Sequence, residues 1–514
     1  MSSGNGENNV IDIQPANFTN SSTRQAFSFA FVLMIICGTI VLSLYHLSDE
    51  LWQDEVYTLL QFASKGPAYP FFDYHLPNNH ILFSALLAKW WTPGSSVEYL
   101  RALPLLLFAL AMVVYTASVI NLGGRIAGIA SLIMFAGSTV TENFALQLRG
   151  YAPSWLPIIA AMTALPRYMQ SGNWTWAMVY VCASAVSVAI LPTNLIFCGI
   201  FVVWGWLLIL LDRKSDLYRR GGQLLIISIG PLLGFVAYSN VLTNLINHSQ
   251  RKISNWNPLY LAIHWFWAVS ADFILLIPFI GLGIIIAARS TFKQPDFSVG
   301  RPANNLALLA ATITTLALWL CILPNPPFPR NLVPFLPVWY YLCGYFFSVG
   351  WKHFLANNTK LNHVLFLPFI GSVYLLAVLT PNCFGIKGNK EFPQDLCTQY
   401  YHEAFYPTRT VQLLNDIIGD RQIPVMTDYD GIYCLGYVIK NSSDIDISLV
   451  HYISWKNSKH LSASPPRIIV TRSVAELQKM LNKTGVTADR YVEIANTGFF
   501  KIYSDSFMPS ELGS

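Results

Sequence analysis

The sequence feature that most constrains the fold is a series of about eleven apolar runs, each close to the length that crosses a bilayer as a helix. A helix satisfies its own backbone hydrogen bonds, which lipid cannot do, so such runs favour helical spans. Only 11% of the 514 residues are charged, whereas soluble domains carry about 25%. The chain is therefore predicted to be a polytopic α-helical membrane protein. The candidate spans are 27–45, 100–120, 126–141, 152–168, 174–190, 194–211, 222–244, 262–288, 304–323, 331–350 and 362–380.

The run at 80–91 is not counted as a span, because about a dozen residues are too few to cross the hydrocarbon core. It begins polar and ends in Lys89, Trp90 and Trp91, a pattern typical of an amphipathic helix in the outer interface. With a cytoplasmic N-terminus, this choice obeys the positive-inside rule, Arg251 and Lys252 being the main exception. The basic residues that it places in the cytoplasm are Arg125, Arg213, Lys214, Arg219, Arg220, Arg289, Lys293, Arg301, Lys352 and Lys360.

Composition divides the chain into three regions. Residues 1–26 are polar and predict a disordered cytoplasmic tail. A membrane domain follows at 27–380, with a long first outer loop at 46–99. In 381–514, short β-branched runs alternate with amphipathic helical patterns, which predicts a small extracytoplasmic α/β domain. No tract rich in Lys and Arg is present, so we do not expect nucleic acid as a partner.

Eight cysteines are present, and most of them lie in apolar runs, where a packing role is expected. Cys383 and Cys397 lie in the polar C-terminal region instead. If that region is outside the cytoplasm, these two thiols are candidates for a disulfide. No CxxC motif and no His-rich metal spacing occurs in the sequence.

The first outer loop concentrates ionisable residues beside the membrane, where they cost solvation energy unless they have partners or a task. Asp54 and Glu55 stand at the start of a helical pattern. One interpretation is an acidic pair that stabilises the positive end of a helix. The other is a catalytic base or a ligand for a divalent metal, Mg or Mn. We predict that this loop is the reactive centre.

The run HLPNNH at 75–80 places short polar side chains directly before the predicted interfacial helix. Asn79 could cap a helix that starts at His80. Alternatively, Asn78, Asn79 and His80 bind a sugar or a phosphate at the helix N-terminus. The sequence pattern supports both interpretations.

Two arginines are predicted on the outer face. Arg149 follows the third span, and Arg330 lies in the proline-stiffened run PNPPFPRNLVPFLP. Guanidinium groups held in this way can bind a phosphate through paired hydrogen bonds, although a lone Arg can also simply reach toward lipid headgroups. Asp272 lies inside the predicted span 262–288 and could bond to Ser270 or Trp265. It receives no assigned role.

Taken together, these blocks resemble the GT-C glycosyltransferases, and within them the branch of the protein O-mannosyltransferases and the lipid A aminoarabinose transferases. The match lies in the order of the blocks and in their common placement on the outer face. The blocks are WQDEVYTL (52–59), LPNNHILFSALLAKWW (76–91), EYLRALPLLL (98–107), LQLRGYAPSW (146–155) and PRNLVPFLPVW (329–339).

The resemblance implies a transferase that takes a sugar from a polyprenyl-phosphate donor and passes it to a glycan, lipid or protein acceptor outside the cytoplasm. By position, Asp54 matches the catalytic acid, with Glu55 beside it, and Arg149 and Arg330 match positions near the donor phosphate. The implied substrate-binding residues are Asn78, Asn79, His80 and Tyr151. The run 76–80 departs from the family's usual HPP-type pattern, which leaves the donor and the acceptor open.

The mechanism predicted from this pattern is inverting transfer, with Asp54 as the base and the two arginines stabilising the departing phosphate. A divalent metal that bridges Asp54 to the phosphate is left open, because the sequence contains no complete ligand set. The alternatives are a transporter or flippase of lipid-linked sugars and a non-catalytic scaffold. Transporters usually contain internal repeats, and none is evident in this sequence.

Overall fold

The computed structural model of the chain describes residues 22–74, 79–211, 217–249, 258–293, 296–322, 329–355, 359–379, 407–419, 423–442, 445–451, 466–471, 474–484, 490–497 and 500–505. Most of residues 1–26, Asn78, and the pair Cys383 and Cys397 lie outside these ranges, so the predictions made for them are not addressed.

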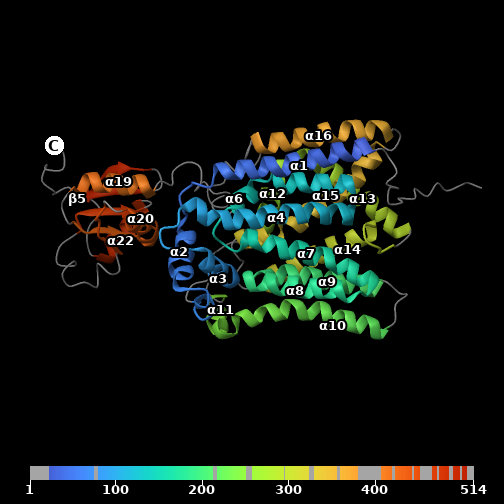
Figure 1. Cartoon of the computed structure of the whole chain (residues 1–514), viewed down its shortest axis with the longest axis horizontal. Helices are drawn as coiled ribbons and strands as arrows, with labels where there is room; N and C mark the ends of the chain where they lie inside the picture. The colour runs from blue at the N-terminus through green and yellow to red at the C-terminus, as the bar shows by residue number, and fades with distance from the viewer. Residues whose placement is uncertain are drawn as a thin grey trace, which may run out of the picture.

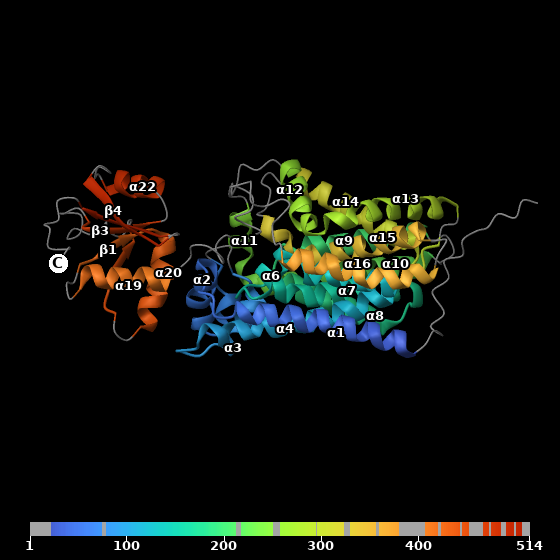
Figure 2. The ribbon, with the colours of Figure 1, turned by 90° about the horizontal axis from the view of Figure 1, so that it is seen from above.

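Long helices lie side by side in a bundle, and a small C-terminal domain sits at one end of it (Figures 1 and 2). In the described ranges, six stretches are long and apolar enough to cross a membrane: Ser28–Tyr45, Val97–Gly123, Asn194–Leu211, Gly221–Asn247, Trp265–Lys293 and Arg330–Phe354. The prediction of an integral membrane protein is thus supported. The bundle helices are α1 (Ser22–Tyr45), α4 (Val97–Gly123), α5 (Arg125–Ala136), α7 (Tyr151–Ser171), α8 (Trp174–Ile190), α9 (Asn194–Leu211), α10 (Leu217–Gly234), α12 (Pro258–Ser270), α13 (Ile277–Lys293), α14 (Pro302–Ile322), α15 (Leu336–Phe354) and α16 (Thr359–Leu379).

The predicted continuous helix over 262–288 is broken in the structure. A 3-10 segment, η4 (Ala271–Leu276), separates α12 from α13, and Phe273 has non-helical backbone angles. Pro278 contributes to the break, because it lacks the N–H that would continue the hydrogen-bond ladder and is well accommodated in the first turn of α13, where that N–H is not needed. Asp272 therefore lies in a break between helices, where its Oδ2 accepts a hydrogen bond from the backbone N of Thr139 at 3.1 Å.

Two other predicted spans are also divided near the end of the bundle that carries the C-terminal domain. The span 126–141 stops at Ala136, and a short helix, α6 (Thr139–Ala145), follows with Ser138 as its N-cap. The span 331–350 begins as a 3-10 segment, η5 (Pro329–Phe335), before α15 continues. Pro334 and Pro337 account for this irregular start. The breaks leave short connecting segments at one end of the bundle.

Helices α13 and α15 approach each other closely at two glycines. A Cβ atom on Gly283 would collide with the carbonyl oxygen of Phe346, and one on Gly350 would collide with the carbonyl oxygen of Phe279. Small residues are typical of helix contacts in membranes, where association depends on close packing rather than on hydrophobic burial. The contact fixes α15, the helix that follows η5, against α13.

The loop between α1 and α4 folds into short helices at the end of the bundle that faces the C-terminal domain (Figure 2). These are α2 (Gln53–Gln61), η1 (Ala63–Lys65), η2 (Tyr69–Phe71) and α3 (Ile81–Trp90). Helix α3 occupies the range predicted for an interfacial helix. At its end, the Trp90 ring stacks on the Tyr99 ring with centroids 5.1 Å apart, and its indole N–H donates to the Tyr99 carbonyl oxygen at 2.9 Å.

The C-terminal domain contains a five-stranded sheet in the order β2-β1-β3-β5-β4. β1 pairs with β2 and β3 in parallel, and β5 pairs with β3 and β4 in the antiparallel direction. The strands are β1 (Val425–Thr427), β2 (Leu449–His451), β3 (Ile468–Thr471), β4 (Tyr491–Asn496) and β5 (Lys501–Asp505), and the helices are α19 (Pro407–Ile418), α20 (Tyr429–Asn441) and α22 (Val474–Thr484).

Alternation along the central strands builds two apolar cores. Val425 and Ile468 face the core that contains α19 and α20, whereas Met426 and Ile469 face the core that contains α22. This follows from the two-residue period of a strand. The helices accordingly cover opposite faces of the sheet (Figure 2).

Helix α2 is the surface on which the C-terminal domain docks. The Trp52 side chain packs against the core of α19 and α20, and the Tyr57 ring meets the Tyr433 ring of α20 edge-on at 5.1 Å. At the start of α19, the backbone N of Thr408 donates to both carboxylate oxygens of Glu50, at 3.1 and 3.3 Å. Burial raises the pKa of the Glu50 carboxyl even though these hydrogen bonds lower it.

Substitution Trp52→Ala should weaken this docking, because it removes the half-buried indole that joins the two parts, at a cost of about 1–2 kcal/mol. We expect faster amide hydrogen exchange in α2 and α20 in detergent-solubilised protein. A suitable control is Trp176→Ala on α8. This removes a half-buried indole that contacts the Arg167 guanidinium near the C-terminal end of α7 and is not part of the docking surface. Unchanged exchange in both helices of the Trp52 variant would contradict the docking.

Candidate active site

Asp54 is shared by two arginines that come from distant parts of the chain. Its Oδ2 lies 2.5 Å from Nη1 of Arg149 and 3.1 Å from Nη1 of Arg330. The Arg149 side chain is only 4% exposed, whereas Asp54 and Arg330 are 18% and 24% exposed. The arrangement is thus a nearly buried guanidinium on one side of the carboxylate and a more accessible one on the other. These three predicted site residues are brought together.

The segment between α6 and α7 positions Arg149. Its backbone N donates to the carbonyl oxygen of Gln147 at 2.7 Å, which makes a tight turn. Tyr151, the first residue of α7, places its ring 5.0 Å from the guanidinium carbon of Arg149. A cation over an aromatic face is attracted by the ring quadrupole. Tyr151 is buried, so in this structure it supports the arginine.

His80 is buried next to this segment at the start of α3. Its Nδ1 accepts a hydrogen bond from the backbone N of Gly150 at 2.5 Å, and its ring meets the Tyr151 ring edge-on at 5.0 Å. Burial holds the pKa of His80 well below its usual range, and the charges of Arg149 and Arg330 lower it further. The imidazole is therefore neutral, with its proton on Nε2, because Nδ1 acts as the acceptor.

Asn79 was one of the residues expected either to cap α3 or to bind substrate, and the capping interpretation is wrong. His80 occupies the N-cap position, and no side chain caps the helix. The Asn79 amide N donates instead to the carbonyl oxygens of Pro70 and Asp73, both at 2.8 Å. Its buried side chain thereby holds the preceding turn of the loop.

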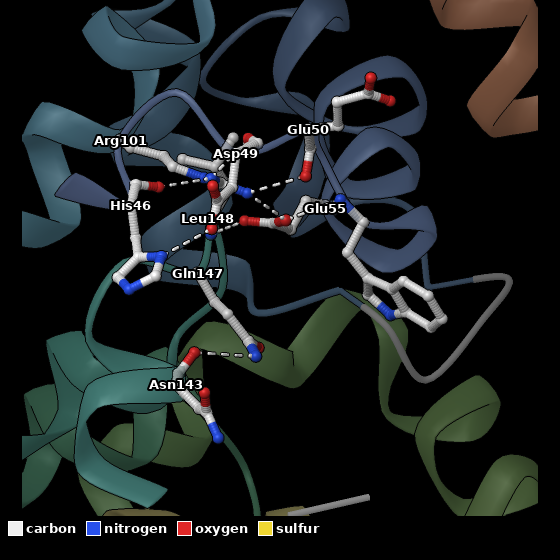
Figure 3. A network of polar contacts seen from close by, with 9 residues as sticks. His46, Asp49, Glu50, Glu55, Arg101, Asn143, Gln147 and Leu148 are labelled. Atoms are coloured by element: carbon white, nitrogen blue, oxygen red, sulfur yellow. Dashed lines mark hydrogen bonds and ion pairs between the residues drawn. The ribbon is translucent and has the colours of Figure 1, made fainter. Parts of the chain in front are cut away.

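Glu55, expected beside Asp54 as a catalytic acid, faces the protein interior and is fully buried. It receives hydrogen bonds from the backbone N atoms of Trp52 and Leu148, at 2.8 and 2.9 Å, and from Nη2 of Arg101 at 3.1 Å (Figure 3). Neighbouring residues on α2 thus have different environments. Asp54, itself partly exposed, lies between the nearly buried Arg149 and the more accessible Arg330, whereas Glu55 is fully buried in its hydrogen-bond network.

Arg101 is the residue of this region that sequence reasoning missed. It lies in the block EYLRALPLLL, where it received no role, and it is fully buried. The usable signal was a single Arg inside an apolar span, because such a charge requires partners within the protein. Its hydrogen-bond partners are carbonyl oxygens of the turn after α1 and the carboxylate of Glu55 on α2.

The side chains around Asp54 do not suit the coordination of a divalent metal ion. Among the residues that the structure describes, no three His, Cys, Asp or Glu side chains come together as a cation site. The Asp54 carboxylate also faces two guanidinium groups, whose charge would repel a metal ion. The described residues around Asp54 therefore do not form a site for a divalent metal.

Comparisons with known proteins support the fold. No family model and no curated protein matches the sequence. The solved apo structure of ArnT from Cupriavidus metallidurans is 12% identical, with a TM-score of 0.54, over 93% of this chain and 98% of ArnT. The structure of the same ArnT bound to undecaprenyl phosphate is 12% identical, with a TM-score of 0.52, over 94% of this chain and 98% of ArnT.

At this identity the comparison shows a shared fold alone, and the proteins that share it are GT-C glycosyltransferases. The resemblance inferred from the sequence blocks is confirmed at that level. The two proteins also have nearly the same extent, because the match leaves little of either chain uncovered.

Gly150 tests how closely this site is packed. A Cβ atom there would lie 2.7 Å from Cγ2 of Ile190 and 2.8 Å from Nδ1 of His80. Gly150→Ala should therefore destabilise the protein by about 1–3 kcal/mol through overpacking, which a thermal unfolding scan would measure. The matched control is Gly221→Ala in α10, where the added methyl meets nothing within 4 Å. Equal unfolding temperatures for both variants would contradict the close packing.

Proposed function

We propose that this protein is a glycosyltransferase that moves a sugar from a polyprenyl-phosphate donor to an acceptor on the outer, extracytoplasmic face of the membrane. The observation that carries the proposal is the carboxylate of Asp54 held between Arg149 and Arg330. A base beside two phosphate-binding cations is the set of groups that glycosyl transfer from a lipid phosphate requires. The proposal includes about eleven membrane crossings and an extracytoplasmic C-terminal domain.

The nature of the donor rests on the site and on the related fold. ArnT, which shares the fold, has been solved with undecaprenyl phosphate bound. In this chain the two arginines can present N–H groups to a phosphate with the planar geometry that phosphate recognition favours. The polar site residues gather at one end of an apolar bundle, where a lipid can keep its chain in the membrane and its headgroup at the site. The sugar and the acceptor stay open.

In the proposed reaction, Asp54 accepts the proton of an acceptor hydroxyl. The hydroxyl oxygen forms a bond to the anomeric carbon of the donor sugar while the bond from that carbon to the phosphate oxygen breaks. The electron pair leaves on the polyprenyl phosphate, and Arg149 and Arg330 stabilise the negative charge that develops there. Attack from the face opposite the phosphate inverts the anomeric configuration. The products are the glycosylated acceptor and the free lipid phosphate.

The phosphate and Asp54 compete for the same two guanidinium groups. In the structure both arginines pair with the Asp54 carboxylate. A phosphate that takes over one or both arginines frees the carboxylate to accept a proton. Arg330, the more exposed arginine, is the one we expect to move to the phosphate first, because Arg149 is held by its turn and by Tyr151. A transporter has no need for a base at this point, so this pairing favours the transferase over the transporter.

Asp54→Asn should greatly slow sugar transfer without abolishing donor binding. We expect sugar transfer from polyprenyl-phosphate donors in proteoliposomes to fall by about 100-fold or more, because the base is lost. Binding of undecaprenyl phosphate should become tighter, since the competing carboxylate is gone. Thermal stabilisation by added lipid phosphate provides the binding measurement.

The matched control is Glu98→Gln, an acid-to-amide change in the first turn of α4. It should leave both transfer and binding as in the wild type. Transfer at the wild-type rate by the Asp54 variant would remove Asp54 from the mechanism. Weaker binding of lipid phosphate would contradict the competition.

Substitution of either arginine should weaken the binding of lipid phosphate, whereas substitution of Asp54 should tighten it. Arg149→Gln and Arg330→Gln should each weaken undecaprenyl phosphate binding and lower the transfer rate by about 100- to 1,000-fold, the usual cost of a lost oxyanion donor. Lys at these positions should recover only part of the rate, because an ammonium cannot bind in a bidentate manner. Arg167→Gln, at the far end of α7, is the control. Wild-type lipid binding in both site variants would exclude this phosphate site.

A further inference from the structure

Glu55, the residue after Asp54, is hydrogen-bonded through its buried carboxylate to Leu148, the residue before Arg149. Oε1 of Glu55 accepts from the backbone N of Leu148 at 2.9 Å, and its Oε2 accepts from the backbone N of Trp52 at 2.8 Å. The first bond ties α2 to the turn that carries Arg149. The second closes the N-terminus of α2 in the manner of a capping box. Glu55 thus links helix α2, which carries Asp54, to the turn that carries Arg149.

Arg101 holds this link from the opposite side. Its Nη1 donates to the carbonyl oxygens of His46 and Asp49, at 3.1 and 2.6 Å, while Nη2 donates to the carbonyl oxygen of Glu50 and to Glu55 Oε2, both at 3.1 Å (Figure 3). A single guanidinium on α4 therefore fixes the turn after α1 and the start of α2 together. Both side chains of the pair are 0% exposed.

We propose that Arg101 and Glu55 are positioning residues that set the geometry between Asp54 and Arg149, and this inference rests on the proposed transferase function. Neither side chain reaches the accessible part of the site, so neither is a catalytic residue. Their effect passes through the backbone of α2 to Asp54 and through Leu148 to Arg149. A catalytic group displaced by about 1 Å can lose about 100-fold in rate.

Stability alone is a weak reason for such a pair. Burying two charges costs desolvation energy that their attraction roughly repays, and apolar replacements of similar volume are often neutral. An apolar pair at 55 and 101 could fill the same space, but it could not hold the backbone N atoms of Trp52 and Leu148. The carboxylate is needed specifically because these two donors come from different segments.

The decisive variant is Glu55→Asp, which keeps the charge next to Arg101 but is one methylene too short to hold all three donors. We expect kcat per folded molecule to fall by at least about tenfold, with kcat/KM for the lipid donor falling in parallel. Amide exchange at Leu148 should become faster. The matched control, Glu98→Asp on the helix that carries Arg101, should change neither quantity.

A double-mutant cycle with Asp54→Asn separates positioning from general structural damage. If Glu55 acts through Asp54, adding Glu55→Asp to the Asp54 variant should cost less than about twofold more, because residues that act as a unit are not additive. Fully additive losses would overturn the proposal, as would a Glu55→Asp enzyme with wild-type kcat.

Two further measurements keep the test decisive. Should Glu55→Asp fail to fold, Glu55→Met combined with Arg101→Met removes both charges together and leaves the same two backbone donors without their acceptor. It should then show the same loss of kcat, and a wild-type kcat would overturn the proposal. If the wild-type protein transfers no sugar, the proposed function fails, but exchange at Leu148 still tests the link: unchanged exchange in Glu55→Asp would refute it.

Discussion

A fully buried guanidinium must find acceptors inside the protein, and this requirement organises the end of the bundle that faces the C-terminal domain. Arg101 is placed in an otherwise apolar helix and takes its acceptors from the turn after α1 and from Glu55. Glu55 in turn needs donors, and it finds them in Trp52 and Leu148. The Arg101–Glu55 pair therefore joins three parts of the chain that are far apart in sequence: residues 46–55, Arg101 on α4 and Leu148. The candidate site is built on that arrangement.

Much of the site could be predicted because the membrane reduces the number of possible arrangements. Once the distribution of basic residues fixes the orientation of the spans, Asp54, Arg149 and Arg330 all fall on one side. The apolar length of each run then limits how far apart they can be. The meeting of these three residues followed from those two constraints and from the sequence blocks that resemble the GT-C family.

Other features depend on side-chain direction and local backbone geometry, which the sequence pattern does not contain. Asp54 and Glu55 are adjacent and alike in charge, yet successive helix positions point about 100° apart, so one faces the site and the other faces the interior. Asn79 is of a residue type that often caps helices, but its amide N donates to the carbonyl oxygens of Pro70 and Asp73 in an earlier turn. The break at Asp272 was readable from Pro278, whereas the partner of Asp272 on α6 was not.

The C-terminal domain and the candidate site share helix α2. Trp52 and Tyr57 contact the domain, while Asp54, between them in sequence, contacts the two arginines. A helix presents different residues of one turn to different neighbours, so a nine-residue helix serves both parts. The residues that contact the domain and the acid of the candidate site are therefore at most three positions apart on one stretch of backbone.

The close contact between α13 and α15 at two glycines helps to fix the position of Arg330. Because Gly283 and Gly350 allow backbone to touch backbone, α15 cannot slide along α13 without a clash of main-chain atoms. Arg330 lies in η5 directly before α15, so its position depends in part on a contact well away from the site. The two arginines thus have unlike supports, a hydrogen-bonded turn for one and a locked helix for the other. The second cation therefore keeps its place beside Asp54 only while α15 keeps its position against α13.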